Sequence, residues 1–269
     1  MPDMNRRHDD VDNDVVDNAG QRQRQRRGIY LLPNMITTAG LFAGFYSIVA
    51  AMNGRFEPAA VAIFVAMIMD GIDGRVARLT HTQSEFGVQY DSLSDMVCFG
   101  LAPALVMYEW SLKSMISVGW AKLGWLAAFI YAASAALRLA RFNAQVATAE
   151  KSYFRGLPSP SAAGVLAGLV WAATDLGIPG KDLVYLVFVL TIATGMLMVS
   201  NVRYFSFKEF NVKNRVSVLA LLVVVLVYAF ASIDPPKVLF AGFMVYAISG
   251  IVYTLLGIRK RRRARKQGE

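Results

Sequence analysis

Long apolar segments constrain this chain more than any other feature of its sequence. They run for about 18 to 24 residues each and are separated by short stretches that hold most of the Arg and Lys. An α-helix needs ~20 apolar residues to cross a bilayer core ~30 Å thick. Charged residues make up only 17% of the chain, against about a quarter in a soluble domain. The sequence therefore predicts an all-α integral membrane protein and excludes soluble, secreted and fibrous classes.

The apolar lengths predict about eight transmembrane helices joined by short connections. They are expected at 29–52, 57–79, 86–111, 119–143, 157–174, 182–201, 215–232 and 236–258. The membrane domain then covers 28–258, and a basic cytoplasmic tail follows at 259–269. Before it, residues 1–27 combine charges with a Gln/Arg repeat and almost nothing to bury, which is typical of a disordered tail. We do not expect a signal peptide, because the first apolar run is long enough to span.

The basic residues favour one orientation of these helices. An even number of spans places both termini on one side, together with the second, fourth and sixth connections. That side receives 23 of the 28 Lys and Arg, and the other side receives five. Because positive charge is retained in the cytoplasm, both termini and the 80–86 connection are expected there, at the inner membrane of the cell. Membrane lipids are the expected partners of the basic tails, in preference to nucleic acid.

Four carboxylates interrupt the second and third apolar segments. Asp70 and Asp73 are spaced i,i+3, so they lie on one face of the second helix. Asp91 and Asp95 are spaced i,i+4 and share one face of the third. The two helices form a hairpin that turns near 80–86, and both pairs are centred on that turn. All four acids are therefore expected at one depth, ~13–18 Å from the turn at 1.5 Å per residue.

Such an acid cluster favours a divalent metal site. Carboxylates in or near lipid are costly and usually functional, and four together repel one another unless a cation lies among them. Ion pairs with Arg75 and Arg78 are the alternative, although two arginines cannot balance four acids and both lie toward the turn. Oxygen ligands suit Mg²⁺ or Mn²⁺, and paired ions suit chemistry on phosphate. Cys98 is the only cysteine and His81 the only histidine outside the N-terminal tail, which excludes thiolate and multi-histidine sites.

Three glycines accompany the acids. Gly71, Gly74 and Gly87 leave helix surface bare, so that a bulky headgroup can approach the backbone. Close packing of membrane helices is the alternative. For Gly71 both interpretations stay open.

The whole pattern resembles the signature of a known enzyme family. Residues 73–95 read DG-x2-AR-x8-G-x3-D-x3-D and are preceded by Asp70. Every fixed position of the signature of the CDP-alcohol phosphotransferases is present at the family spacing. Residues 33–37 open the first span as in this family. Three further segments resemble the branch whose acceptor alcohol is serine: 137–143, 154–160 and 198–204.

The resemblance implies a metal-dependent transfer from a CDP-lipid to an alcohol. It implies that two divalent ions, Mg²⁺ or Mn²⁺, are held by four acids: Asp70, Asp73, Asp91 and Asp95. Asp70 and Asp91 would bridge the ions, and Asp95 would also be the general base. The residues implied to contact the CDP-lipid are Asn34, Thr37, Gly74, Arg78, Ser84 and Gly87. Relatives in this family form dimers, so a homodimer is expected.

The branch resemblance further implies CDP-diacylglycerol as donor and L-serine as acceptor, giving phosphatidylserine and CMP. Arg138, Arg141 and Arg155 lie near the cytoplasmic ends of the fourth and fifth spans and are candidates for binding the carboxylate of serine. They suit the phosphate of glycerol 3-phosphate or an inositol compound equally well, and positive-inside anchoring explains them too. Ser159 and Ser161 are expected to shape the start of the fifth span rather than to take part in chemistry.

Three other readings of the acids compete with this one. The nearest alternative is a sister enzyme of the same family that uses another acceptor alcohol. A membrane prenyltransferase needs two separate Asp-rich motifs, and the later apolar spans hold no comparable pair. An ion-coupled transporter typically has repeated halves, and the 70–95 pattern has no second copy.

Overall fold

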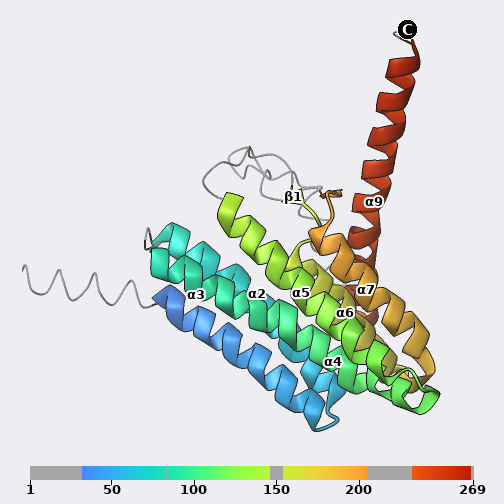
Figure 1. The fold of residues 1–269 in the computed structure, drawn as a ribbon. Helices are drawn as coiled ribbons and strands as arrows, with labels where there is room; N and C mark the ends of the chain where they lie inside the picture. Colours follow the sequence, from blue (N-terminus) through green and yellow to red (C-terminus); the bar gives the residue numbers. More distant parts are fainter. Residues whose placement is uncertain (1–31, 81, 83, 146–153, 205–231, 268–269) are drawn as a thin grey trace, which may run out of the picture.

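A computed structural model describes residues 32–80, 82, 84–145, 154–204 and 232–267. In these ranges the chain forms a bundle of helices that run side by side, with one helix projecting beyond it (Figure 1). The long elements are a first helix Leu32–Met52, α2 Phe56–Leu79, α3 Glu85–Asp95, α4 Ala102–Trp110, α5 Ala121–Gln145, α6 Ser159–Asp175, α7 Val184–Val199 and α9 Pro235–Gln267. Shorter segments join them: the π-helix η1 Met96–Leu101 and the 3-10 helices η2 Leu112–Val118 and η3 Gly180–Leu183.

Seven of the eight expected helices appear within the described ranges, with ends shifted by a few residues. The helix expected at 215–232 lies outside the described residues except for its last position. The span expected at 86–111 is one continuous helical rod made of α3, η1 and α4. α9 continues to Gln267, although the sequence predicted a separate tail from 259. Arg and Lys are good helix formers, so the basic segment extends the helix instead of ending it.

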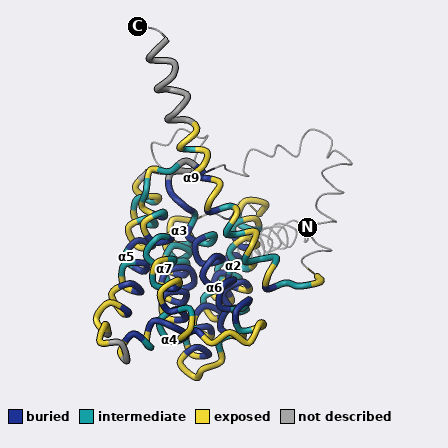
Figure 2. The backbone as a smooth tube through the Cα atoms, turned by 90° about the vertical axis from the view of Figure 1, so that its right-hand side faces the viewer, coloured by how far each residue is buried: buried dark blue, intermediate teal, exposed yellow. Residues whose placement is uncertain are grey.

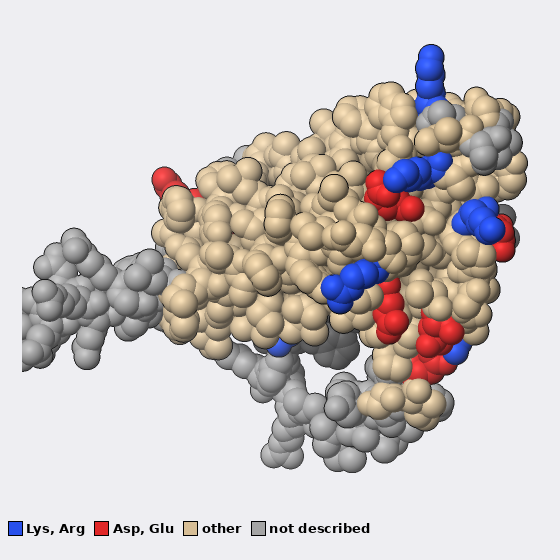
Figure 3. Space-filling model, turned by 90° about the horizontal axis from the view of Figure 1, so that it is seen from below, with Lys and Arg blue, Asp and Glu red and all other residues tan. Residues whose placement is uncertain are grey.

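Four of the described helices are long and apolar enough to cross a membrane: Leu32–Met52, Lys122–Ala144, Gly180–Val199 and Pro235–Leu256. α6 is shorter, with 17 residues, and is enclosed by its neighbours (Figure 2). One face of the molecule is a broad uncharged surface, with most of its Lys, Arg, Asp and Glu gathered toward one end (Figure 3). The apolar helices make the chain a multi-pass membrane protein.

Glycines let α6 and α9 approach closely. A Cβ atom at Gly168 would lie 2.9 Å from the Cα of Phe240, and one at Gly164 would lie 2.8 Å from the ring of Phe243. On another side α6 meets α2, where the rings of Phe64 and Trp171 lie 5.8 Å apart. Between helices in lipid, such van der Waals contact replaces the hydrophobic effect as the main attraction. α6 is therefore the buried centre of the bundle.

The first helix packs through a second pair of glycines, four residues apart. A Cβ atom at Gly40 would lie 3.3 Å from the Cβ of Met69 in α2. At Gly44 it would lie 2.7 Å from the Sγ and 3.0 Å from the Cα of Cys98 in η1. This Gly-x3-Gly spacing brings the first helix against both helices that carry the acids.

A two-stranded pair, β1 Phe154–Arg155 and β2 Arg203–Tyr204, ties the start of α6 to the end of α7. Gly156 follows with a φ of +81°, and a Cβ atom there would collide with the carbonyl oxygen of Met198. The Tyr204 hydroxyl donates to the Ala247 carbonyl of α9 at 3.0 Å. Burial raises the pKa of Tyr204 to about 12, so this hydroxyl remains a neutral donor.

Candidate active site

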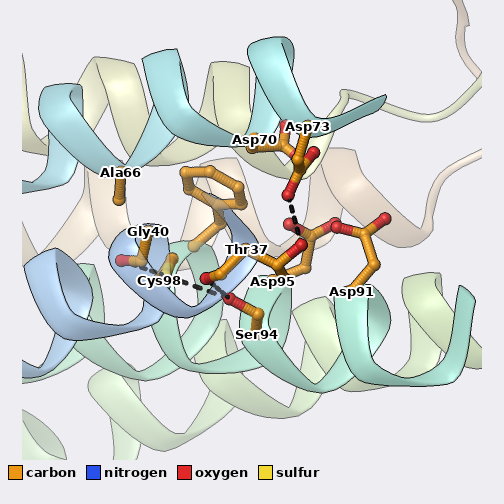
Figure 4. A pocket seen from close by; sticks show the side chains of 10 residues that line it. Thr37, Gly40, Ala66, Asp70, Asp73, Asp91, Ser94, Asp95 and Cys98 are labelled. Atoms are coloured by element: carbon orange, nitrogen blue, oxygen red, sulfur yellow. Dashed lines mark hydrogen bonds between the residues drawn. The ribbon is translucent and has the colours of Figure 1, made fainter. Parts of the chain in front are cut away.

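Three carboxylates converge between α2 and the rod of α3 and η1. One carboxylate oxygen from each of Asp70, Asp91 and Asp95 lies within 4.8 Å of the other two. Figure 4 shows Asp70 entering from α2 and the other two from α3, on facing sides of one cavity. The i,i+4 spacing on α3 is what directs both of its acids at α2.

Asp73 is held by a different set of contacts. The Thr37 hydroxyl of the first helix donates to Asp73 Oδ2 at 2.6 Å, and both side chains are buried. Ser94 of α3 donates to the Thr37 carbonyl at 3.4 Å. Thr37 thus joins the first helix to α2 and α3 at the level of the acids. Its hydroxyl is engaged by a carboxylate, and the resemblance also implies that Thr37 contacts the CDP-lipid.

The cavity around the acids is narrow and has an apolar floor. Its lining consists of Thr37, Gly40, Ala66, Asp70, Asp73, Asp91, Ser94, Asp95, Cys98 and Phe99 (Figure 4). Cys98 donates to the Gly40 carbonyl at 3.3 Å, and the buried Tyr131 hydroxyl donates to the Phe99 carbonyl at 3.0 Å. Both bonds lie at the π-helix η1, which begins directly after Asp95. A π-turn inside a helix is often found at a functional site.

Cationic side chains do not neutralise these acids in the described part of the chain. The ion pairs there join Lys113 to Glu109 and Lys237 to Asp175 and Asp234, all away from the cavity. Arg75 and Arg78 are exposed and pair with none of the four acids. The ion-pair alternative is therefore wrong for these residues. Converging carboxylate oxygens without a counter-charge are the donor set that a hard divalent cation requires.

Asn34, Ser84 and Gly87 meet at the ends of the first helix and α3. Ser84 caps α3, and its hydroxyl accepts from the Gly87 amide at 3.0 Å. A Cβ atom at Gly87 would lie 3.2 Å from Ser84 Oγ and 3.5 Å from Asn34 Oδ1. The resemblance implies one ligand for all three, and the fold places them within contact of one another.

The α2 glycines face open space. A Cβ atom at Gly71 or Gly74 would have no described atom within 4 Å. Packing against another described helix therefore does not explain Gly71, for which the sequence left both interpretations open. Arg78 lies exposed in the last turn of the same helix. The cytoplasm-facing end predicted for α2 thus combines bare backbone with a guanidinium group.

The candidate serine-binding arginines contact the end of α7. Arg138 Nη1 donates to the Met198 carbonyl at 3.5 Å, and Arg141 Nη2 donates to Asn201 Oδ1 at 3.0 Å. Arg155 lies in β1, paired with Arg203, and its side chain is outside the described part. These contacts bring together the three segments that resembled one branch of the family, although they are far apart in the sequence.

Asn143 links this arginine cluster to the acids. Its Nδ2 donates to Ser92 Oγ at 3.0 Å, and the Ser92 hydroxyl lies 3.3 Å from Asn143 Oδ1. Ser92 is the neighbour of Asp91 on α3, and Asn143 follows Arg141 by two residues on α5. The end of α5 therefore spans the distance between the two groups.

Comparison with known proteins identifies the family. A sequence model of the CDP-alcohol phosphatidyltransferases matches residues 30–200. The chain belongs to this family. The CDP-diacylglycerol–serine O-phosphatidyltransferase of Helicobacter pylori is 33% identical over 224 residues, which are 83% of this chain and 91% of that protein. Proteins of the same name match from Mycobacterium bovis, with 37% identity over 67% of this chain and 64% of theirs, and from Saccharomyces cerevisiae, with 33% over 52% and 53%.

Sequence reasoning missed two parts of this CDP-alcohol phosphatidyltransferase site. One is the π-helix, for which residues 96–101 give no recognisable pattern. The other is the role of the first helix, whose Gly40 and Gly44 show the Gly-x3-Gly spacing and could have been read as a packing face.

Proposed function

We propose that this chain transfers the phosphatidyl group of CDP-diacylglycerol to the hydroxyl of L-serine, giving phosphatidylserine and CMP. The observation that carries the proposal is the convergence of Asp70, Asp91 and Asp95 on one cavity without a cationic partner among the described residues. Relatives that carry this activity in their names match over most of the chain and support the choice of serine.

The four acids would hold divalent cations, Mg²⁺ or Mn²⁺, and we propose two of them. The ligands would be Asp70, Asp73, Asp91 and Asp95, with Asp70 and Asp91 shared between the ions. When bound, the ions supply positive charge that neutralises the diphosphate and stabilises the departing CMP. Thr37 keeps one oxygen of Asp73 occupied and so fixes the direction in which the other can point.

The CDP-lipid would lie across the cytoplasmic ends of the first helix, α2 and α3. Gly74 lets it approach the backbone of α2, where no described side chain stands in the way. Arg78 offers paired donors to phosphate oxygens, and Asn34 with the capped start of α3 would contact the nucleotide. Thr37, Ser84 and Gly87 complete this proposed set. The acyl chains would remain in the bilayer beside the uncharged face (Figure 3).

The reaction needs a base and a precise alignment. The serine hydroxyl attacks the phosphorus on the lipid side of the diphosphate, the bond to the CMP oxygen breaks, and Asp95 takes the hydroxyl proton. Asp95 is suited to this because it lies deepest of the α3 acids, next to the buried η1. Positioning and electrostatics supply most of the catalysis in phosphoryl transfer, so no covalent enzyme intermediate is required.

The acceptor would bind on the α5 side of the acids. Arg138, Arg141 and Arg155 are proposed to bind the carboxylate of serine. A guanidinium group has five N–H donors, and the two bonds from Arg141 to α7 and Asn201 leave others for a ligand. The same bonds fix the position of this guanidinium, which favours recognition of an anion over free movement.

We further propose the inner membrane as the location, with the active site and both termini in the cytoplasm, and a homodimer as the assembly. The positive-inside distribution supports the orientation. CDP-diacylglycerol, serine and membrane lipids would be the partners, and nucleic acid would not.

The experiment that tests the function is an acceptor panel with purified protein and labelled CDP-diacylglycerol. L-serine should yield labelled phosphatidylserine in the presence of Mg²⁺ or Mn²⁺ and none after chelation. Turnover with glycerol 3-phosphate or an inositol compound and not with serine would assign the chain to a sister activity instead.

A further inference from the structure

The first turn of α6 contains a polar group that the fold leaves unused. Ser159 is 2% exposed, and its hydroxyl oxygen has no hydrogen-bond partner among the described residues. A buried hydroxyl without a partner costs stability, so most are satisfied. The helix end adds the backbone N–H groups of Ser159 and Ser161, which have no acceptor within the helix. Pro158 and Pro160 have no N–H, and the Ala162 amide donates to the Pro158 carbonyl at 2.9 Å. Both features favour an anion with acceptor oxygens at this place.

Ser159 faces the interior of the bundle and not the lipid. At 100° per residue it lies opposite Gly164 and Gly168, which pack on α9. It shares its face with Leu166 and Val170, both fully buried at 0% exposure. α2 and η1, which carry or adjoin the acids, pack against α6. The hydroxyl therefore points away from α9 and into the packed interior of the bundle, where the neighbours of α6 include η1.

Contacts between α5 and the α3–η1 rod show which residues of α5 lie at the same depth as the acids. Asn143 bonds to Ser92, and a Cβ atom at Gly100 would lie 3.2 Å from Ala135. Both pairings follow one antiparallel register between α5 and the α3–η1 rod. Asp95 is therefore level with the turn of α5 around residue 140.

The start of α6 lies deeper than that turn of α5. A Cβ atom at Gly195 of α7 would lie 3.1 Å from the Cα of Tyr131, so Met198 is level with about residue 134 of α5. The Arg138 side chain reaches the Met198 carbonyl from the same part of α5. The Leu157 amide donates to the neighbouring Leu197 carbonyl at 2.9 Å, and Ser159 follows two residues later. The α6 N-terminus thus lies within about two helical turns, ~10 Å, of the depth of the acids. It also lies beside a guanidinium that approaches the same end of α7.

We propose that the first turn of α6, with the Ser159 hydroxyl as donor, binds the carboxylate of the acceptor amino acid. The proposal rests on the proposed function and names the residue that distinguishes serine from uncharged alcohols. Arg138 supplies the positive charge beside this site, and the serine hydroxyl extends from it toward Asp95. Ser159 then does more than shape the start of the span, which is all that the sequence indicated.

The test compares Ser159→Ala with Ser161→Ala in the full-length purified protein. Ser161 lies in the same turn, is only half-buried and points elsewhere, so it is a matched control. Loss of a hydrogen bond to a charged group should raise the KM for L-serine roughly ten- to a hundred-fold in Ser159→Ala. The KM for CDP-diacylglycerol and the kcat should stay within about two-fold, and Ser161→Ala should match the parent.

Serinol has the hydroxyl and amine of serine but no carboxylate. It therefore separates recognition of the serine carboxylate by Ser159 from a role of Ser159 in helix packing. Its turnover should be equal in the parent and in Ser159→Ala. An unchanged KM for L-serine, or an equal loss with serine and serinol, would overturn the proposal and leave Ser159 a packing residue. A parent protein that makes no phosphatidylserine would contradict the proposed function itself, and the two failures are thereby distinguishable.

Discussion

At the scale of single residues, the four acids differ in what holds them. Asp73 is fixed by the Thr37 hydroxyl and is buried, whereas Asp70, Asp91 and Asp95 direct oxygens at one another. Because like charges at this distance repel strongly away from water, the three converging acids depend on a bound cation more than Asp73 does. Substitutions at the two kinds of acid should therefore have different consequences.

Asp95→Asn should reduce turnover by at least ~10²-fold, since a general base contributes about 10²–10⁴-fold. Binding of CDP-diacylglycerol should be comparatively intact, because the base acts on the acceptor. Asp91→Asn should abolish turnover and also weaken metal binding, because a ligand shared between the ions becomes a neutral amide; the weaker binding is measured directly and not through activity. Metal titrations with both variants check this, and substantial activity in Asp95→Asn would remove it from the role of base.

Thr37→Val removes a charge-assisted hydrogen bond while keeping the shape of the side chain. The kcat/KM should fall roughly ten- to a hundred-fold, because Asp73 loses the contact that directs it. Thr37→Ser retains the hydroxyl and should stay near the parent. Equal activity in Thr37→Val and Thr37→Ser would show that this bond does not position the acid.

At the scale of elements, the first helix is held by close contact with η1. Gly44→Ala places a methyl group against Cys98, where both Sγ and the backbone Cα are in the way. Overpacking of this kind costs about 1–3 kcal/mol, so the melting temperature in detergent should fall. Gly242→Ala in α9 meets no described atom within 4 Å and should leave the melting temperature unchanged or slightly higher. A Gly44→Ala protein as stable as the parent would mean that the first helix can shift away without cost.

The sequence predicted the helices and the facing positions of the acids well. It did not predict the hydrogen-bond partners of individual side chains. Apolar length and the i,i+3 and i,i+4 spacings are local properties, so the helices and the facing acids followed from them. The engagement of Thr37 by Asp73 and of Arg141 by Asn201 depends on which helices become neighbours. The Ser159 hydroxyl, which has no partner in the described part of the chain, is likewise a property of packing, which no spacing along the chain encodes.

At the scale of the whole molecule, the charge distribution predicts the orientation in the membrane. Reporter fusions after residues 83 and 260 should behave as cytoplasmic, and fusions near residues 55 and 180 as external. The reason is that the two termini and the second, fourth and sixth connections together contain 23 of the 28 Lys and Arg, and positive charge is retained in the cytoplasm. A cytoplasmic signal at residue 180 would contradict the arrangement of spans.

The π-helix η1 determines which changes of chain length the third span tolerates. A π-turn holds one residue more than an α-turn within a single turn of the helix. Deletion of one residue between Met96 and Leu101 should therefore restore α-helical bonding while the acids of α3 and the buried face of α4 keep their directions. The same deletion inside α3 or α4, where no wide turn absorbs it, would rotate the two faces by about 100° relative to each other. Changes of chain length are thus expected to be tolerated at η1 and not in the helices on either side of it.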